Sequence, residues 1–331
     1  MKKIAVLGPI PYDHITTAKG QEIEKYGCVT HPVIGLAKLL KGQGEVLPIA
    51  HIRQEDYEAV EELFAPIGNI RMEGILTEKD QGDVIELKFV DQNNRLEKQT
   101  AFMPPIGPED VAPFLDCDIF VGVPITDYEV PLATLRYIKE NTSHHPLIIF
   151  DAHGPTTVAT TTGHRLRRFW VERDLWLPYI DVLKMNIEEA GCCWFKKEFD
   201  ASELNETYQE LTEDEMDALA KYVLERGVKA LYITLDSRGC MVYHQTNGTF
   251  EKQFVPSVKV DEVIDTTGCG DSFAGGLAYG LIDDASAYVR AAQYANALGA
   301  RRTQGTTFDV FWALEATQDL IRQNYGIDTA L

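Results

Sequence analysis

Short apolar runs recur along the chain, and the segments between them repeat their apolar residues every three to four positions. The runs predict buried strands at residues 4–8, 45–52, 118–124, 146–152, 181–186 and 230–235. The periodic segments predict helices at residues 31–40, 55–67, 129–140 and 212–227. Strands that alternate with helices are typical of a mostly parallel sheet covered on both faces. Because no linker-like tract interrupts residues 1–331, the pattern predicts a single α/β domain.

The helix expected at residues 212–227 carries its own boundary signals. Thr212 stands at the first position with Glu215 three residues later, which is the pattern of a capping box. Gly227 follows the last periodic residue, as expected at a helix C-terminus.

One segment, residues 74–103, alternates apolar and polar positions instead. Turn-forming residues interrupt it at Gln92-Asn93-Asn94, which predicts a hairpin with one solvent-facing side. Such an appendage on an α/β core serves either as a lid over a site or as a contact between subunits.

The overall charge narrows the classes of partner. The chain has 331 residues and a formal net charge of −20, which disfavours binding to nucleic acid and to anionic membranes. Its six cysteines form no C-x-x-C pair, so reduced thiols are expected. No apolar run approaches the roughly 20 residues of a membrane span, and the run at residues 4–8 is too short for a signal peptide. These features favour a cytoplasmic protein.

The segment DTTGCGDSFAGGLAYGL, residues 265–281, carries the clearest candidate chemistry. Glycines at 268 and 270 predict a turn into a helix, whose free N–H groups and dipole would form an anion site. Asp271 lies in the first turn of that helix, where it is either an N-terminal capping residue or a base beside a bound phosphate. The G-x-G-x-x-G and G-x-x-x-x-G-K-[ST] patterns are absent here.

DTTGCGDSFAGG closely resembles the C-terminal signature D-T-x-G-A-G-D of the PfkB (ribokinase-like) sugar and nucleoside kinases. Further segments resemble that family's motifs in the family's order, namely IAVLGPIPYD, KMNIEEA, YITLDSRGCMVY and ANALGARRTQG. The resemblance covers nearly the whole chain. It implies a ribokinase-like α/β fold, with a mostly parallel central sheet flanked by helices on both faces. It also implies a small β-sheet lid built from parts of about 11–30 and 70–105.

On the acceptor side, the resemblance implies an ATP-dependent phosphoryl transfer to a hydroxyl of a small carbohydrate or nucleoside. Asp271 would be the general base. The anion hole would be formed by the N–H groups of Gly268, Cys269 and Gly270. The substrate-binding residues would be Asp13, Gly27 and His31.

On the donor side, the resemblance implies ATP with Mg²⁺, which Asn186 and Glu189 would hold through water. The nucleotide-binding residues would be Asn186, Glu189, Thr234, Asp236, Gly239 and Asn296. A monovalent cation, K⁺ in this family, would bind the loops that contain Asp265, Thr267 and Gly305. The resemblance is also consistent with a homodimer formed through the lid.

The sequence departs from the family pattern mostly on the acceptor side. The family's N-x-D reads Pro11-Tyr12-Asp13, and its G-G-x-x-x-N reads 26–31 with one glycine lost and His31 in place of asparagine. On the donor side, Asp236 stands in the T-x-G turn and Cys269 replaces an alanine. These departures predict an unusual acceptor, such as a polyol, a sugar derivative or a nucleoside.

Two further candidates leave alternatives open. His153, which follows a predicted strand, either reaches a pocket at the sheet edge or is a simple loop residue. The arginine-rich stretch 164–174 is either a solvated helix face or, through Arg165 or Arg167 near Trp170, part of a site for an acidic substrate.

Three functional classes remain. They are an ATP-dependent kinase, a ligand-binding protein that has lost turnover on a kinase fold, and a nicotinamide-dependent dehydrogenase. The last is disfavoured because the first strand is followed by Gly8-Pro9-Ile10-Pro11 rather than by a dinucleotide fingerprint.

Overall fold

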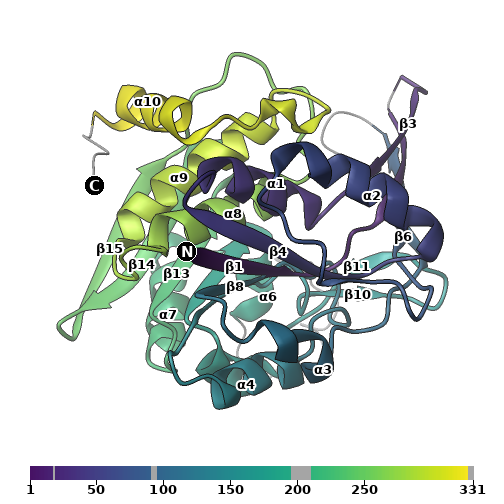
Figure 1. The fold of residues 1–331 in the computed structure, drawn as a ribbon. Helices are drawn as coiled ribbons and strands as arrows, with labels where there is room; N and C mark the ends of the chain where they lie inside the picture. Colours follow the sequence, from purple (N-terminus) through teal and green to yellow (C-terminus); the bar gives the residue numbers. More distant parts are fainter. Residues whose placement is uncertain (18, 91–94, 195–209, 327–331) are drawn as a thin grey trace, which may run out of the picture.

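The centre of the molecule is a nine-stranded sheet in the order β15-β14-β13-β12-β9-β8-β1-β4-β5 (Figure 1). The computed structural model describes residues 1–331 except 18, 91–94, 195–209 and 327–331. The strands are β1 (Lys2–Leu7), β4 (Gly44–His51), β5 (Ile75–Leu76), β8 (Ile119–Gly122), β9 (Leu147–Asp151), β12 (Val182–Asn186), β13 (Ala230–Thr234), β14 (Gly239–Thr246) and β15 (Thr249–Pro256). All neighbouring strands from β13 to β5 are parallel, and the β13–β14 and β14–β15 pairs are antiparallel. The predicted, mostly parallel α/β sheet is confirmed.

Helices cover both faces of this sheet, as predicted (Figure 1). Ile4 and Val6 of β1 contribute to one buried cluster and Ala5 and Leu7 to the other, because successive side chains of a strand point to opposite faces. One cluster includes residues of α1 (Thr30–Leu39), α2 (Tyr57–Phe64), α8 (Cys269–Leu281), α9 (Tyr288–Arg302) and α10 (Leu314–Tyr325). The other packs against α3 (Pro108–Val111), α4 (Leu132–Asn141), α5 (Arg173–Trp176), α6 (Ile187–Cys193) and α7 (Glu213–Leu224). Short 3₁₀ turns occupy Gln54–Asp56, Ala65–Ile67, Ala112–Phe114, Leu177–Tyr179, Asp236–Arg238 and Phe308–Val310.

Local signals account well for α7. Thr212 and Glu215 form the predicted capping box, in which each side chain accepts from the other residue's backbone N–H. The helix ends at Leu224, and Gly227 adopts a φ of +103° just beyond it.

Glycines of α8 allow this helix to pack closely against its neighbours, which places its N-terminus. A Cβ atom on Gly276 or Gly280 would overlap the backbone of α9, and one on Gly275 would lie 3.0 Å from Pro32 of α1. The absence of side chains therefore lets α8 pack closely between these two helices. Substitution of a large residue at any one of these positions would overpack the core and lower the free energy of unfolding by about 1–3 kcal/mol.

A separate four-stranded sheet stands at one end of the main sheet, in the order β3-β2-β6-β7. Its strands are β2 (Tyr12–Thr16), β3 (Glu22–Tyr26), β6 (Val84–Phe89) and β7 (Arg95–Ala101), and we call it the lid sheet. The predicted hairpin is present as β6 and β7, although its turn at 92–94 lies outside the described residues. Residues 75 and 76, which were expected to belong to this hairpin, join the main sheet as β5 instead. Ile15, Ile85 and Leu87 form its buried side.

The arginine-rich stretch does not form the helix face considered as one alternative. Residues 165–167 form β11 (Arg165–Arg167), which pairs antiparallel with β10 (Thr157–Ala159). A bridge between Lys98 and His164 attaches this small hairpin to β7 of the lid sheet. The helical interpretation is wrong for these residues, because they pair with β10 and the hairpin is attached to β7 through the Lys98–His164 bridge. None of the described helices has the length and apolarity needed to span a membrane.

Candidate active site

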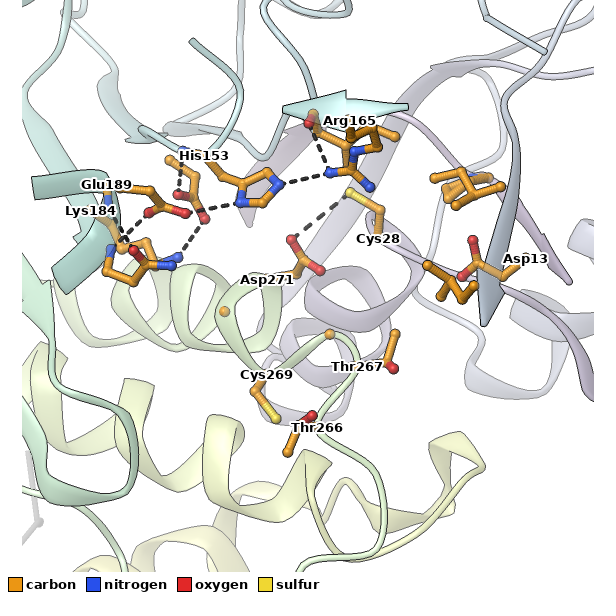
Figure 2. A pocket seen from close by; sticks show the side chains of 18 residues that line it. Asp13, Cys28, His153, Arg165, Lys184, Glu189, Thr266, Thr267, Cys269 and Asp271 are labelled. Atoms are coloured by element: carbon orange, nitrogen blue, oxygen red, sulfur yellow. Dashed lines mark hydrogen bonds and ion pairs between the residues drawn. The ribbon is translucent and has the colours of Figure 1, made fainter. Parts of the chain in front are cut away.

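A cavity of about 220 Å³ lies at the carboxyl edge of the parallel strands (Figure 2). Its walls come from the ends of β9 and β12, the turn that leads into α8, the small β10–β11 hairpin and the lid sheet. Open α/β sheets bind ligands at this edge because loops and helix N-termini converge there. The cavity collects most of the polar residues singled out in the sequence.

The turn into α8 forms one wall. Gly268 caps the helix with a φ of +82°, a conformation that favours glycine. The N–H of Cys269 donates within the turn to the carbonyl of Thr266 at 3.3 Å. Over the described part of the chain, the N–H groups of Gly268 and Gly270 have no protein acceptor. These donors at the positive end of the helix dipole suit an anion.

Asp271 projects from the first turn of α8 into the same cavity (Figure 2). Burial and the nearby Asp151 carboxylate raise its pKa to about 6, against the opposing charge of Lys184. The thiol of Cys28 lies 3.9 Å from Asp271 Oδ1 and donates to the carbonyl of Val123 at 3.1 Å. Among the described residues, no backbone N–H donates to Asp271 as it would to a cap, so its carboxylate can accept from a ligand in the cavity. A carboxylate with a pKa in this range is suited to take up a proton near neutral pH.

A buried ion pair that the sequence analysis missed lies beside Asp271. Lys184 Nζ of β12 donates to Asp151 Oδ2 of β9 at 2.7 Å, and both side chains are at most 5% exposed. Burial lowers the pKa of Lys184, but the Asp151 carboxylate outweighs this and raises it, so the ammonium stays charged. A Cβ atom on Gly270 would lie 3.0 Å from Lys184 Nζ, which places this charge against the anion-binding turn. A charged residue inside an otherwise apolar strand was the available signal in the sequence.

Asn186 and Glu189 face the cavity as the two ends of one capping box. Asn186 Oδ1 accepts from the N–H of Glu189, and Glu189 Oε2 accepts from the N–H of Asn186, both at 2.7 Å. Burial acts to raise the pKa of Glu189, but the positive charge of Lys184 holds it below its ordinary value. This explains the N-x-x-E spacing locally and leaves an ionised carboxylate at the cavity wall.

His153 lies between Glu189 and Arg165 (Figure 2). Its Nε2 lies 2.8 Å from a guanidinium nitrogen of Arg165, which can only donate, so Nε2 accepts and Nδ1 carries the proton toward Glu189 at 2.9 Å. Arg165 also binds Glu97 of β7 at 2.9 Å and donates to the carbonyl of Ile125 at 3.0 Å. His153 is therefore a cavity residue and not a simple loop residue.

The other members of the arginine-rich stretch lie elsewhere. Trp170 is buried in the core against Trp176, away from the cavity lining. Arg167 donates to Thr157 Oγ1 at 3.0 Å and lies 3.4 Å from Glu189.

The structure places some of the predicted substrate residues at the cavity and others away from it. Asp13 is buried at the cavity wall, and Gly27 lies so close to its carboxylate that no Cβ would fit between them. His31 is fully buried behind Gly268 and does not line the cavity. Cys28, which follows Gly27, has a φ of +45°, a conformation that favours glycine.

The predicted nucleotide residues other than Asn186 and Glu189 lie outside this cavity. Thr234 ends β13, and Asp236 follows with a φ of +54°. Gly239 has a φ of +129° and leaves no room for a side chain beside the carbonyl of Val255. Asn296 is buried, and its amide donates to the carbonyl of Pro256 at 3.0 Å.

The residues expected around a monovalent cation already have protein partners. Asp265 Oδ1 accepts from the N–H of Thr267 at 2.8 Å. Its Oδ2 and the carbonyl of Gly305 both accept from the guanidinium of Arg302. The described residues contain no cluster of three or more His, Cys, Asp or Glu side chains that could hold a metal.

Comparison with known proteins finds a matching family model, curated relatives and many similar structures. The model of the pfkB family of carbohydrate kinases matches residues 160–307. The 2-dehydro-3-deoxygluconokinase of Bacillus subtilis (strain 168) is 40% identical over 88 residues, which are 27% of this chain and 26% of that enzyme. The chain therefore matches about a quarter of that relative's length.

Solved structures resemble the chain over almost its whole length. The ribokinase from Giardia lamblia superposes with a TM-score of 0.75 at 15% identity, covering 98% of this chain and 99% of that one. A pyrophosphate-dependent kinase in the ribokinase family, complexed with a pyrophosphate analog and myo-inositol, gives a TM-score of 0.69 at 18% identity over 92% and 96%. At these identities the similarity establishes the ribokinase-like fold alone.

Proposed function

Because the chain belongs to the PfkB family of carbohydrate kinases, we propose that it transfers the γ-phosphoryl group of ATP to a hydroxyl of a small carbohydrate or nucleoside. The observation that carries this proposal is the position of Asp271. A carboxylate with a pKa of about 6 shares one cavity with the turn at 268–270, whose N–H groups suit an anion. Phosphoryl transfer needs these two elements together, a base for the acceptor hydroxyl and donors around the moving group.

In the mechanism we propose, Asp271 accepts the proton of the acceptor hydroxyl as the hydroxyl oxygen attacks phosphorus. The new O–P bond forms as the bond to the leaving oxygen of the donor breaks, so the negative charge moves onto the donor product. Asp13 is suited to bind other hydroxyls of the acceptor, because its carboxylate faces the same cavity. The buried sides of the lid sheet, including Ile85 and Leu87, would keep water from competing as acceptor.

On the phosphoryl side, the N–H groups of Gly268 and Gly270 and the ammonium of Lys184 would bind the transferred group. Lys184 has hydrogen-bonding capacity beyond its contact with Asp151, because an ammonium carries three protons. Asn186 and Glu189 fit a hydrated Mg²⁺, which takes one or two carboxylates together with waters and phosphates. When bound, Mg²⁺ would neutralise charge on the donor phosphates.

The donor is the finer part of the proposal. ATP is favoured by the resemblance of residues 232–243 and 295–305 to the family's nucleotide-binding segments. Pyrophosphate is the alternative, since structurally similar kinases use it. Both donors present a phosphoryl group to the same kind of anion site, so the cavity around Asp271 does not discriminate between them.

A coupled assay of phosphoryl transfer tests the proposal. Sugars, sugar acids, polyols and nucleosides are tried with ATP or pyrophosphate as donor, in parallel with Asp271→Asn. One donor and one acceptor that support turnover in the wild type, with loss of turnover in the variant, would establish the reaction. If ATP binds but no acceptor is phosphorylated, the hypothesis of a ligand-binding protein on a kinase fold gains support. Homodimerisation through the lid sheet stays a prediction.

A further inference from the structure

Arg302, the last residue of α9, is a deeply buried charge behind the anion-binding turn. Its side chain is 1% exposed and contacts three acceptors from three separate segments. It donates to Asp265 Oδ2 at 2.8 Å, to the carbonyl of Gly305 at 2.6 Å and to His31 Nδ1 at 3.1 Å. A planar guanidinium can hold all three acceptors at once because its donors diverge in a fixed fork.

Two of these acceptors are the oxygens expected to bind a monovalent cation. Such a cation needs carboxylate and carbonyl oxygens as direct ligands, and a protein cation that donates to the same oxygens competes with it for them. Here Asp265 Oδ2 and the Gly305 carbonyl both accept from Arg302. The donor set therefore does not fit K⁺, since a protein cation stands where the ion would have its ligands.

A second protein cation reaches the same carboxylate from the lid sheet. Lys25 Nζ of β3 lies 2.7 Å from Asp265 Oδ2, and its side chain is 12% exposed. Burial acts to raise the pKa of Asp265, but Lys25 and Arg302 more than offset this and hold it below its ordinary value. An additional cation at this place would be repelled by two positive groups that share one carboxylate.

Two residues that contact Arg302, namely Asp265 and His31, also contact the anion-binding turn. Asp265 Oδ1 accepts from the N–H of Thr267, the residue before Gly268. His31, held at Nδ1 by Arg302, packs against Gly268 so closely that a Cβ atom there would overlap its ring. One side chain thus fixes the start of the turn through Asp265 and its centre through His31.

We propose that Arg302, assisted by Lys25, takes the structural place of the monovalent cation, so that the turn is organised by the chain itself and needs no K⁺. Arg302 is a positioning residue, because it acts on the reacting groups through Asp265 and His31. The consequence for turnover rests on the proposed kinase function, but the consequence for cation binding does not.

The first test uses the wild-type protein and does not require activity. Thermal unfolding is followed in KCl, NaCl, CsCl and tetramethylammonium chloride at equal ionic strength, about 100 mM, so that screening is constant. A bound ion would raise the unfolding temperature in proportion to the logarithm of its concentration. We expect the same unfolding temperature in all four salts. A rise specific to K⁺ would overturn the proposal.

The second test measures turnover in the same salts once a donor and an acceptor are known. We expect rates that agree within about twofold, because a misplaced turn would cost about 10²-fold. Turnover that requires K⁺ would refute the role of Arg302 while leaving the kinase proposal intact. Absence of turnover with every donor and acceptor, together with salt-independent unfolding, would refute the kinase proposal alone.

Variants test whether Arg302 is the residue that supports the turn. Arg302→Ala is expected to lose about 10²-fold in kcat and to recover part of it in about 20 mM guanidinium chloride, since the free ion can occupy the vacated space. Arg301→Ala is the matched control, because the neighbouring guanidinium donates to the Val310 carbonyl and stacks on Trp312 instead. If Arg302→Ala does not fold, Arg302→Lys is used instead, because it keeps the charge without the forked donors. Its kcat should lie between the value expected for Arg302→Ala and that of Arg301→Ala. Equal kcat for Arg302→Lys, Arg301→Ala and the wild type would contradict the proposal.

Discussion

Gly268→Ala is the change that tests the architecture of the anion-binding turn most directly. Gly268 has a φ of +82°, where an L-residue costs about 1–2 kcal/mol. The new Cβ would also overlap the ring of His31, which is fully buried and held by Arg302. Overpacking of this kind costs about 1–3 kcal/mol, so we expect a total loss near 3 kcal/mol.

The expected effects differ for stability and for activity. With an unfolding entropy of about 2.1 cal/mol/K per residue, a loss near 3 kcal/mol lowers the unfolding temperature of 331 residues by roughly 4 °C. Because His31 cannot yield without moving Arg302, the turn itself must shift, and a shift of about 1 Å costs about 10²-fold in turnover. Activity is therefore the more sensitive measurement.

The control separates backbone strain from the clash. Gly42 has a φ of +79° and nothing within 4 Å of an added Cβ, so Gly42→Ala carries the strain alone. We expect it to lose about 1–2 kcal/mol and no activity. The double variant His31→Ala/Gly268→Ala removes the clash, and kcat/KM should be lost by less than the product of the two single effects. If Gly268→Ala keeps the turnover of Gly42→Ala, then His31 does not support the turn.

Further predictions concern the base, the buried cation and the lid contact. Asp271→Asn should lower kcat/KM by about 10²–10⁴-fold, with an unfolding temperature equal to or above that of the wild type. The turnover rate should fall about tenfold per pH unit below a pH of about 6 and level off above it, because only the carboxylate accepts a proton and the pKa of Asp271 is raised. A rate that does not change with pH below about 6 would exclude Asp271 as the base. Lys184→Met should leave Asp151 unpaired and cost about 3–5 kcal/mol in urea unfolding. Glu97→Gln should weaken the contact to Arg165, raising KM for the acceptor with little change in kcat, and an unchanged KM would show that the contact does not hold the lid sheet.

The sequence predicted the parts of the fold that depend on local periodicity. The parallel strands, the helices on both faces and the capping box at Thr212 and Glu215 follow from apolar spacing and from hydrogen bonds within one turn. The same holds for the Asn186–Glu189 spacing, which the structure explains as a second capping box. Motif resemblance brought Asp13, Asn186, Glu189 and the turn before Asp271 to one cavity.

Contacts between distant segments were not predictable in this way. The pairing of Lys184 with Asp151 spans 33 positions, and that of Arg302 with His31 spans 271. Periodicity describes which side of an element is buried, but not which buried polar group will meet which. The β10–β11 hairpin is local in sequence, but its arginines are placed by contacts with the more distant Glu97 and Glu189, which the charge pattern did not indicate.

The departures from the family pattern take on a different meaning once they are placed in space. His31 was expected on the acceptor side, but it lies between Arg302 and Gly268 behind the anion-binding turn. An altered residue at that place changes how the turn is supported, and not which hydroxyl is bound. The imidazole Nδ1 of His31 supplies one of the three acceptors that satisfy the buried guanidinium of Arg302. We therefore expect the choice of acceptor to depend on residues that line the cavity, such as Asp13 and Arg165.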